Sequence, residues 1–339
     1  MNRYIPRRVF LGGAVSSLSL LKGGVALCAG QNPRPGVEQD SKTGKRSGPS
    51  VAGGANKKTG WIDAHVHVWT PDVERYPIDT HRFSVDDMVP ASFTPRQLMA
   101  ECQPSGVDRV VLIQMSFYNT DNSYMLDVIK KYPGVFSGVG IVDHHAADLP
   151  RQIAALADSG VRGFRISRRG ADTKSWLTDS GMAKLWEIAG RNGLSICPLI
   201  NPADFAVIDQ LCVKYPETRV VIDHFGRVGV TGEIVPAQLN SLCQLARHRN
   251  VHVKTSAFYA LGKKQTPYKD LLPMLRRVVD AFSPQRLMWA SDCPYQVQGK
   301  HDYQSSIDLV GEHLNPLSKA DRQWILRGTA EKVFFNKVS

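Results

Sequence analysis

From residue 61 onward the sequence predicts an α/β protein of the (β/α)8 TIM-barrel class. Eight short runs rich in β-branched residues alternate with amphipathic stretches of helical period, and together they fill the rest of the 339-residue chain. Strands are expected at 61–68, 109–115, 136–142, 161–166, 194–200, 219–225, 251–256 and 286–291. Helices are expected at 94–103, 122–131, 148–158, 180–191, 203–214, 236–247, 268–281 and 302–314, with a closing helical region at 318–336.

A doubly wound open sheet is the alternative architecture, and the sequence argues against it. Such a sheet would need fewer strands and a glycine-rich turn after the first one. The patterns G-x-G-x-x-G, G-x-x-x-x-G-K-[ST] and G-x-S-x-G are all absent. Their absence argues against nucleotide binding and against the common serine-hydrolase layout.

The segment 1–30 predicts an export signal. In "PRRVFLGGAVSSLSLL" an arginine pair is followed, after one residue, by Phe10 and Leu11 and then by a modest apolar stretch that Lys22 interrupts. This pattern resembles a twin-arginine signal, with cleavage expected near Ala29 or Gly30. We therefore expect export by the twin-arginine route to the periplasm or another extracytoplasmic compartment. The sequence contains no run of eighteen or more apolar residues, so it predicts no transmembrane helix.

Residues 31–60 predict a disordered linker, because they are rich in Gly, Ser, Pro and Lys and offer almost nothing to bury. The net charge of +11 is concentrated in the signal and this linker. Segment 1–30 has four basic and no acidic residues, and segment 31–60 has six basic and two acidic residues. Only +3 remains for the barrel, 61–339, so the charge does not indicate a nucleic-acid partner.

The cysteines beyond the signal predict free, buried thiols rather than disulfides or a zinc knuckle. Their number is odd, their spacing is wide, no C-x-x-C occurs, and most lie in apolar segments. They are Cys102, Cys197, Cys212, Cys243 and Cys293.

The first predicted strand, "WIDAHVHV", carries three polar residues at alternate positions. Asp63, His65 and His67 alternate with apolar neighbours, and on a regular strand this spacing would place all three on one face. Either the histidines are satisfied core residues or they form one wall of an active site.

Polar residues at the ends of other predicted strands favour the active site, because chemistry in a (β/α)8 barrel gathers at the C-terminal ends of the strands. Each residue also has a structural explanation, such as a turn at "DHFG" or a helix N-cap at "SDCP". Their joint occurrence favours function. The set is His65 and His67 on the first strand, Arg165, Arg168 and Arg169 after the fourth, Asp223, His224 and Arg227 after the sixth, Lys254 on the seventh and Asp292 after the eighth.

The segments "IDAHVHVW", "VRGFRIS", "VVIDHFGR", "RLMWASDCPY" and "RGTAEKVFF" resemble the amidohydrolase-related (amidohydrolase 2) family of barrel hydrolases. Within that family the similarity is to the lactonase branch, which includes pyrone-dicarboxylate and sugar-lactone hydrolases. The resemblance extends from Trp61 to Phe335. It implies a hydrolase that opens an anionic lactone or related ester by attack of water on the carbonyl, with Asp292 as the base that takes the proton of the water.

The resemblance also implies that His65, His67 and His224 surround the carbonyl oxygen. They would either hold a divalent metal such as Zn²⁺ or Mn²⁺ as a Lewis acid, or donate hydrogen bonds directly to the oxyanion. A mononuclear site would use His65, His67 and Asp292, with His224 as a further ligand. The fifth strand, "LSICPLINP", supplies neither the histidine nor the lysine ligand of many relatives in the wider superfamily. The sequence leaves both alternatives open.

Arginine and tyrosine residues are the candidates for substrate binding. Arg165, Arg168 and Arg227 suit a carboxylate-bearing substrate, because the guanidinium fork matches two carboxylate oxygens. Salt bridges to neighbouring acidic residues are the structural alternative. Tyr76, after the first strand, and Tyr295, after the eighth, could contact the substrate, with core packing as the alternative.

Two other functions are compatible with the barrel. A metal-dependent decarboxylase of the same family would be favoured by a histidine on the fifth strand, which is absent. A non-catalytic sugar-acid-binding barrel is disfavoured, because a decayed site would have lost the histidine pair or Asp292.

Overall fold

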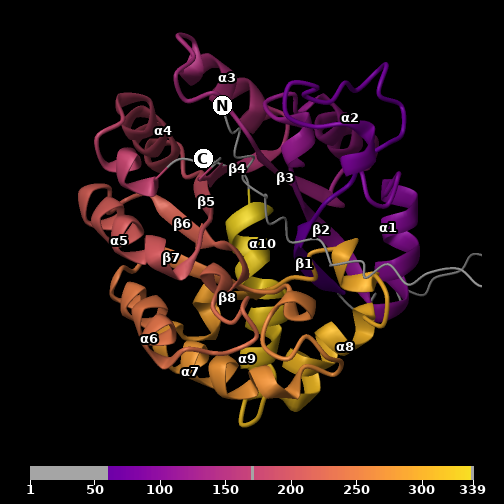
Figure 1. The fold of residues 1–339 in the computed structure, drawn as a ribbon, viewed down its shortest axis with the longest axis vertical. Coiled ribbons are helices and arrows are strands. Elements are labelled where there is room, and N and C mark those ends of the chain that lie inside the picture. The colour runs from indigo at the N-terminus through magenta and orange to yellow at the C-terminus, as the bar shows by residue number, and fades with distance from the viewer. Residues whose placement is uncertain (1–59, 169–171, 337–339) are drawn as a thin grey trace, which may run out of the picture. The chain divides into compact units, whose positions relative to one another are not determined.

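The computed structural model describes residues 60–168 and 172–336, in which eight parallel strands are surrounded by helices (Figure 1). Each strand is hydrogen-bonded to the next from β1 to β8. β8 returns to β1 through a parallel bridge between Val66 and Cys293 and through a hydrogen bond of 2.9 Å from Asp292 N to His65 O. The predicted (β/α)8 barrel is thus confirmed. The predicted signal, and the predicted linker except for Gly60, lie outside the described residues.

The elements follow the predicted order. The strands are β1 (Trp61–Val66), β2 (Val107–Ile113), β3 (Phe136–Gly140), β4 (Val161–Ser167), β5 (Ser195–Leu199), β6 (Arg219–Ile222), β7 (Val251–Thr255) and β8 (Leu287–Trp289). The helices are α1 (Pro95–Cys102), α2 (Ser123–Lys131), α3 (Leu149–Asp158), α4 (Ser180–Arg191), α5 (Phe205–Lys214), α6 (Pro236–Gln244), α7 (Leu272–Phe282), α8 (Tyr303–Asp308), α9 (Lys319–Gln323) and α10 (Thr329–Phe334).

Several element boundaries differ from the prediction by a few residues, and two differences in the elements have a clear structural basis. The strand expected at 219–225 ends at Ile222, because the backbone is left-handed from His224 to Arg227. The two last helical regions each combine an α-helix with a π-helical turn, at Leu309–His313 and Trp324–Gly328. Sequence periodicity does not separate these two helical forms.

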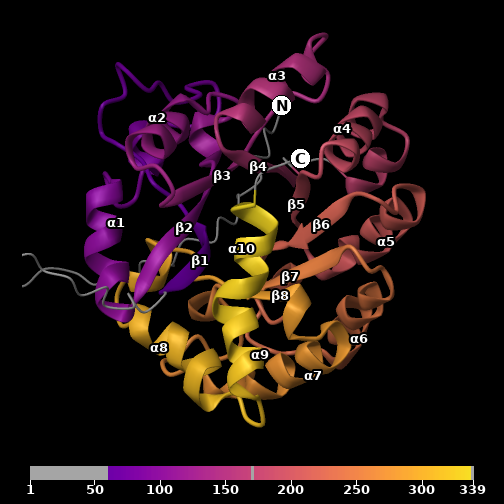
Figure 2. The same cartoon turned by 180° about the vertical axis from the view of Figure 1, so that it is seen from behind.

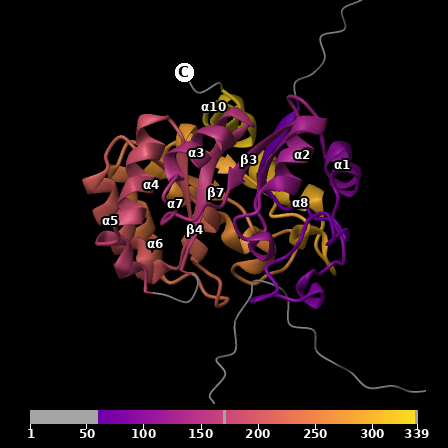
Figure 3. The same ribbon diagram turned by 90° about the horizontal axis from the view of Figure 1, so that it is seen from above.

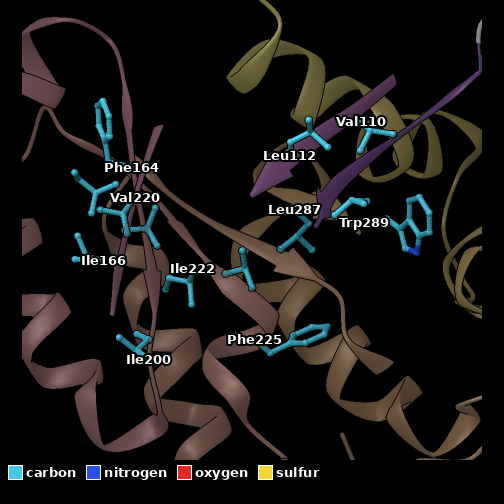
Figure 4. Packing of buried hydrophobic residues seen from close by; sticks show 14 of the residues in the cluster. Val110, Leu112, Phe164, Ile166, Ile200, Val220, Ile222, Phe225, Leu287 and Trp289 are labelled. Atoms are coloured by element: carbon cyan, nitrogen blue, oxygen red, sulfur yellow. The ribbon is translucent and has the colours of Figure 1, made fainter. Parts of the chain in front are cut away.

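The strands pack two different cores, because successive side chains point to opposite faces. One cluster faces outward against the helices, and several of its members are shown in Figure 4: Val110, Leu112, Val220, Ile222, Leu287 and Trp289. The residues between them fill the barrel interior, among them Val111, Ile113, Val221 and Met288. This double burial explains why the strands are nearly continuous apolar runs.

Helix α10 covers the N-terminal end of the barrel. Ala330, Val333 and Phe334 pack into the interior cluster, and α10 lies across the centre of the strands in Figure 2 and at one edge of the barrel in Figure 3. The preceding Arg327 donates a hydrogen bond of 2.9 Å to Asp108, beside the start of β2. Since this end is filled by apolar side chains, the polar residues gather at the opposite end.

Two further sequence predictions concern the whole barrel. The five cysteines are buried and free, as predicted. Across residues 60–168 and 172–336, no helix has the length and apolar character needed to cross a membrane.

Candidate active site

The predicted single polar face of β1 is wrong for Asp63, because β1 contains a β-bulge. Asp63 pairs with Val110 and Val66 pairs with Leu112, so three residue steps on β1 face two on β2. One extra residue reverses the alternation of side chains. Asp63 therefore points outward, and His65 points into the barrel.

Asp63 supports the segment that follows β8. Its carboxylate accepts hydrogen bonds from the backbone N–H of Ser291 (2.9 Å), from the Ser291 hydroxyl and from the Tyr303 hydroxyl of α8. Burial raises the pKa of Asp63 to about 6, although these hydrogen bonds oppose the rise. Because Ser291 precedes Asp292, Asp63 holds the segment that carries the predicted base.

His65 and His67 both direct Nε2 toward Asp292. The two Nε2 atoms are 3.3 Å apart, and they lie 3.5 and 3.4 Å from Oδ1 of Asp292. Nδ1 of His67 donates a hydrogen bond of 2.8 Å to the carbonyl oxygen of Ile113, since a carbonyl can only accept. Nδ1 of His65 lies 3.2 Å from Oδ1 of Asp223. The His67 tautomer that donates to Ile113 keeps the lone pair on Nε2. The same holds for His65 when its Nδ1 proton faces Asp223 rather than the Nζ atom of Lys254, which also lies 3.2 Å from Nδ1.

A buried ion cluster lies beside His65. Oδ1 of Asp223 is 3.0 Å from Nζ of Lys254, and Oδ2 is 3.6 Å from a terminal nitrogen of Arg165. Burial alone would raise the pKa of Asp223, but the charge of Lys254, the adjacent His65 ring and the charge of Arg165 hold it well below its usual value. Burial and then the charge of Lys254 lower the pKa of His65, so this ring is neutral near pH 7. Lys254 also lies 5.6 Å from the Phe334 ring, which joins the cluster to α10.

An unusual backbone turn carries His224. Four consecutive residues from His224 to Arg227 have positive φ, at 52°, 55°, 59° and 62°. Residues with a Cβ rarely adopt this conformation, and such strain is concentrated at functional sites. Gly226 is also required sterically, because a Cβ there would overlap the ring of Phe205.

The turn directs His224 at Oδ2 of Asp292, whereas His65 and His67 approach Oδ1. Nε2 of His224 is 3.8 Å from Oδ2 of Asp292, and Nδ1 is 2.8 Å from the hydroxyl of Ser256. Burial lowers the pKa of His224 to about 4, although Asp292 and Asp223 oppose the shift. The ring is therefore neutral near pH 7.

Asp292 is the centre of the arrangement. It has a left-handed backbone (φ 70°) and is 3% exposed. Burial would raise its pKa, but His224, His67 and His65 outweigh burial and hold the pKa well below its usual value. Among the described residues, its Oδ1 atom is buried without a hydrogen bond of good geometry. The carboxylate is thus ionised and has one oxygen available.

Sequence reasoning missed Tyr259, whose hydroxyl donates a hydrogen bond of 2.7 Å to Oδ2 of Asp292. It also missed Ser256 at His224 and Tyr303 at Asp63. These residues lie in mixed apolar and polar segments with no distinguishing spacing. Lys254 did give a signal, since a lysine inside an apolar strand run is unusual.

The structure brings Arg165 and Arg227 to the site more closely than Arg168. Among the described residues, the Nε atoms of Arg165 and Arg227 are buried without a hydrogen-bond partner. Arg165 is near enough to lower the pKa of His224, and its charge also contributes to the lowered pKa of Arg227. Arg168 follows β4, is 43% exposed in its side chain and lies 3.9 Å from Asp204. Arg169 is outside the described residues.

The two candidate tyrosines differ in their surroundings. The Tyr295 ring lies 6.0 Å from the His67 ring, and its pKa is raised by burial and then by the charge of Asp292. The Tyr76 hydroxyl donates a hydrogen bond of 2.6 Å to Asp127 of α2. Substrate contact by either tyrosine stays a prediction.

The donor atoms fit a divalent metal. Ligands bound at 2.0–2.1 Å around a tetrahedral zinc ion lie about 3.3 Å apart. The Nε2 atoms of His65 and His67 and Oδ1 of Asp292 are 3.3–3.5 Å apart, and donor atoms of His65, His224 and Asp292 lie within 4.8 Å of one another. Ile113 and Asp223 hold the far nitrogens, which is how ligating histidines are usually oriented. Lone pairs that converge on a carboxylate favour a cation between them.

Comparisons with known proteins relate this chain to one family of enzymes. The family model described as "Amidohydrolase" matches residues 62–335. The L-fucono-1,5-lactonase of Burkholderia ambifaria is 31% identical over 239 residues, which cover 69% of this chain and 80% of the relative. The 2-pyrone-4,6-dicarboxylate hydrolase of Comamonas testosteroni is 31% identical over 281 residues, which cover 79% of this chain and 88% of the relative.

Solved structures share the fold. A structure from Pseudomonas putida, provisionally described as a 2-pyrone-4,6-dicarboxylic acid hydrolase, has 26% identity and a TM-score of 0.69, and the match covers 82% of this chain and 98% of the other. An amidohydrolase from Burkholderia multivorans with bound zinc has 20% identity and a TM-score of 0.68, and the match covers 81% of this chain and 99% of the other.

Proposed function

The chain belongs to the amidohydrolase family, as its sequence predicted, and from this premise we propose that it hydrolyses the ester bond of a carboxylate-bearing lactone. One observation carries the proposal: the ionised Asp292 faces three imidazoles at the C-terminal ends of the strands. The two relatives at 31% identity are a lactonase and a hydrolase of a pyrone, which is also a cyclic ester. The pyrone of the second carries two carboxylates.

Asp292 performs the proton transfers in this proposal. Its carboxylate takes a proton from a water molecule as the water oxygen attacks the lactone carbonyl carbon. The ring C–O bond then breaks, and the protonated Asp292 returns the proton to the departing alkoxide oxygen. The product is a hydroxy acid, and Asp292 is again ionised. The low pKa of Asp292 keeps its carboxylate ionised at neutral pH.

The histidines act on the carbonyl oxygen. His65, His67 and His224 direct their Nε2 atoms toward the space next to Asp292, where charge develops on the oxygen during attack. A divalent ion held by His65, His67 and Asp292, with His224 as a further ligand, would polarise this carbonyl as a Lewis acid. The neutral state of His65 and His224 suits metal ligands, which bind through an unprotonated nitrogen.

The arginines give the preference for an anionic substrate. Arg165 and Arg227 each have a buried Nε without a partner among the described residues, which a substrate carboxylate would satisfy. Arg165 is already compensated in part by Asp223, so Arg227 is the freer cation of these two. Arg168 would add an outer contact.

The decarboxylase alternative has weaker support. The observed β5 places Cys197 in the barrel interior and carries no imidazole that could complete a more extended metal site. The alternative of a non-catalytic sugar-acid-binding barrel has weaker support as well. Binding alone does not require an ionised Asp292 beside the neutral rings of His65 and His224.

We further propose that residues 1–30 direct twin-arginine export. The basis is the arginine pair before Phe10 and Leu11. A fusion of residues 1–60 to a reporter that is active only after export in a folded state should be secreted. Replacement of Arg7 and Arg8 by lysine should block secretion; secretion that persists would exclude this route.

The decisive experiment is a panel of lactones and linear esters, each with and without carboxylate groups. We expect turnover of carboxylate-bearing lactones by the wild type and its loss in Asp292→Asn, which keeps the shape but cannot accept the proton. Circular dichroism and thermal melting confirm the fold of the variant. Turnover that survives in Asp292→Asn, or a wild type inactive on every ester, would refute the proposal.

A further inference from the structure

A second group of metal-donor side chains lies outside the candidate active site. His144 and His145 follow β3, and Asp179 precedes α4. Nε2 of His145 is 3.2 Å from Oδ2 of Asp179, and Nε2 of His144 is 3.8 Å from Oδ1 of the same carboxylate. One donor atom from each residue lies within 4.8 Å of the other two.

The carboxylate of Asp179 is held in place by the helix that follows it. Its Oδ1 atom accepts a hydrogen bond of 2.7 Å from the backbone N–H of Met182, as the N-cap of α4. This bond orients Oδ2 toward His145, in the way that an outer hydrogen bond orients a ligating carboxylate.

The loop with both histidines lies directly against the first turn of α4. A Cβ at Gly181 would overlap the carbonyl oxygen of His144 and would come within 2.9 Å of Nδ1 of His145. Only glycine allows this approach without displacing the loop. The three donors are therefore brought together by the backbone and not by mobile side chains alone.

Simple ion pairing accounts poorly for two histidines at one carboxylate. An imidazole forms an ion pair with a carboxylate only when it is protonated, whereas a neutral ring donates a single hydrogen bond through its one N–H. The two rings lie with centroids 4.3 Å apart, so two protonated rings here would repel each other. A divalent ion removes the conflict, because both rings bind it in the neutral form and the carboxylate balances its charge.

We propose that His144, His145 and Asp179 bind one divalent transition-metal ion, with zinc as the best fit to two imidazoles and one carboxylate. The 3.2 Å separation of His145 and Asp179 already matches the spacing of ligands around zinc. His144 needs to move by about half an ångström to reach the same spacing of about 3.3 Å. The side chains are 31%, 58% and 25% exposed, so water can complete the coordination. The ion would join the β3–α3 loop to the start of α4 and stabilise the fold without taking part in catalysis.

The test is zinc binding by the intact protein, measured by calorimetry and by equilibrium dialysis with metal analysis. The variants are His145→Gln and Asp179→Asn; asparagine is also a good N-cap, so α4 keeps its cap. His81→Gln is the matched control, because His81 is an exposed histidine of the same barrel and is not part of the group. Thermal melts in a chelator and in excess zinc accompany each titration.

We expect the wild type and His81→Gln to bind one more equivalent of zinc than either variant. Zinc should raise the Tm of the wild type by several degrees more than that of the variants, since an ion that binds only the folded state stabilises it. In chelator all four proteins should melt alike, and in excess zinc all four should show equal activity, which separates this site from Asp292 and its histidines. Equal zinc stoichiometry and equal Tm response in the wild type and both variants would overturn the proposal. If one variant fails to fold, the other still decides the result.

Discussion

The hydroxyl of Tyr259 donates a hydrogen bond of 2.7 Å to Oδ2 of Asp292, and this bond sets the orientation of the carboxylate. With Oδ2 engaged, Oδ1 faces His65 and His67 at 3.5 and 3.4 Å. Burial, and then the charge of Asp292, raise the pKa of Tyr259 well above its usual value. The hydroxyl therefore remains a donor throughout the neutral range.

Replacement of Tyr259 by phenylalanine should slow the reaction without much effect on substrate binding. Hydrogen bonds to charged groups contribute about 1.5–3 kcal/mol, so we expect kcat to fall by roughly tenfold or more and KM to change little. Steady-state kinetics on a carboxylate-bearing lactone provides the measurement. Tyr132→Phe is the control, because Tyr132 packs on Phe136 outside the site. A Tyr259→Phe enzyme with normal kcat would show that the bond does not position Asp292.

When kcat/KM is measured against pH, its decline on the acid side should occur at a pH below the ordinary pKa of histidine. The reaction needs Asp292 ionised and the buried rings of His65 and His224 neutral. Burial lowers the pKa of His224 to about 4, so this ring stays neutral until the pH falls through that value. We expect kcat/KM to be constant from neutral pH downward and to decline only near pH 4. A decline centred near about 6.5, the ordinary histidine pKa, would contradict this view of the site.

Removal of an arginine should weaken binding of anionic substrates selectively. For Arg227→Met we expect KM for a carboxylate-bearing lactone to rise about tenfold or more, since a charge-assisted contact of about 1.5–3 kcal/mol is lost. KM for a neutral lactone of the same ring size should change little. Arg165→Met should raise KM as well, and it should also disturb Asp223, its ion-pair partner. Arg249→Met is the control, because Arg249 is exposed and pairs with Glu217. Equal effects on charged and neutral lactones would argue against carboxylate recognition.

Asp63→Asn should destabilise the protein. The amide nitrogen cannot accept the hydroxyl hydrogen bonds of Ser291 and Tyr303, so we expect a loss of about 1–3 kcal/mol in the free energy of unfolding. The pKa of Asp63 is raised to about 6, so its protonation stabilises the folded wild type below that pH, and this contribution is lost as the pH rises through it. The deficit of the variant should therefore widen as the pH falls from about 7 to 5. Urea titrations at both pH values measure it, and a deficit independent of pH would show that Asp63 titrates normally.

Metal removal should reveal whether the histidines hold an ion. If the two proposed sites are both filled, zinc analysis should find two equivalents, one lost in His67→Asn and the other in His145→Gln. Chelation should then lower kcat/KM, and added zinc or manganese should restore it. Full activity of the metal-free wild type would instead assign His65, His67 and His224 to direct hydrogen bonds to the carbonyl oxygen, donated from protonated Nε2 atoms.

The sequence by itself determined the order of strands and helices and most of the polar residues at the site. Strand and helix periodicity are local properties, so β1 to β8 could be placed to within a few residues. His65, His224 and Asp292 could be grouped because a (β/α)8 barrel brings the C-terminal ends of its strands together. The family resemblance then supplied the chemistry.

Only the tertiary structure decided which side chains meet and how. The bulge in β1 depends on register with β2, and it separates Asp63 from His65 although both belong to one pattern. The left-handed turn from His224 to Arg227 is maintained by surrounding packing that no local propensity indicates. Tyr259 reaches Asp292 from a loop 33 positions away in the chain. Contacts of this kind depend on distances between elements, which a single sequence does not encode locally.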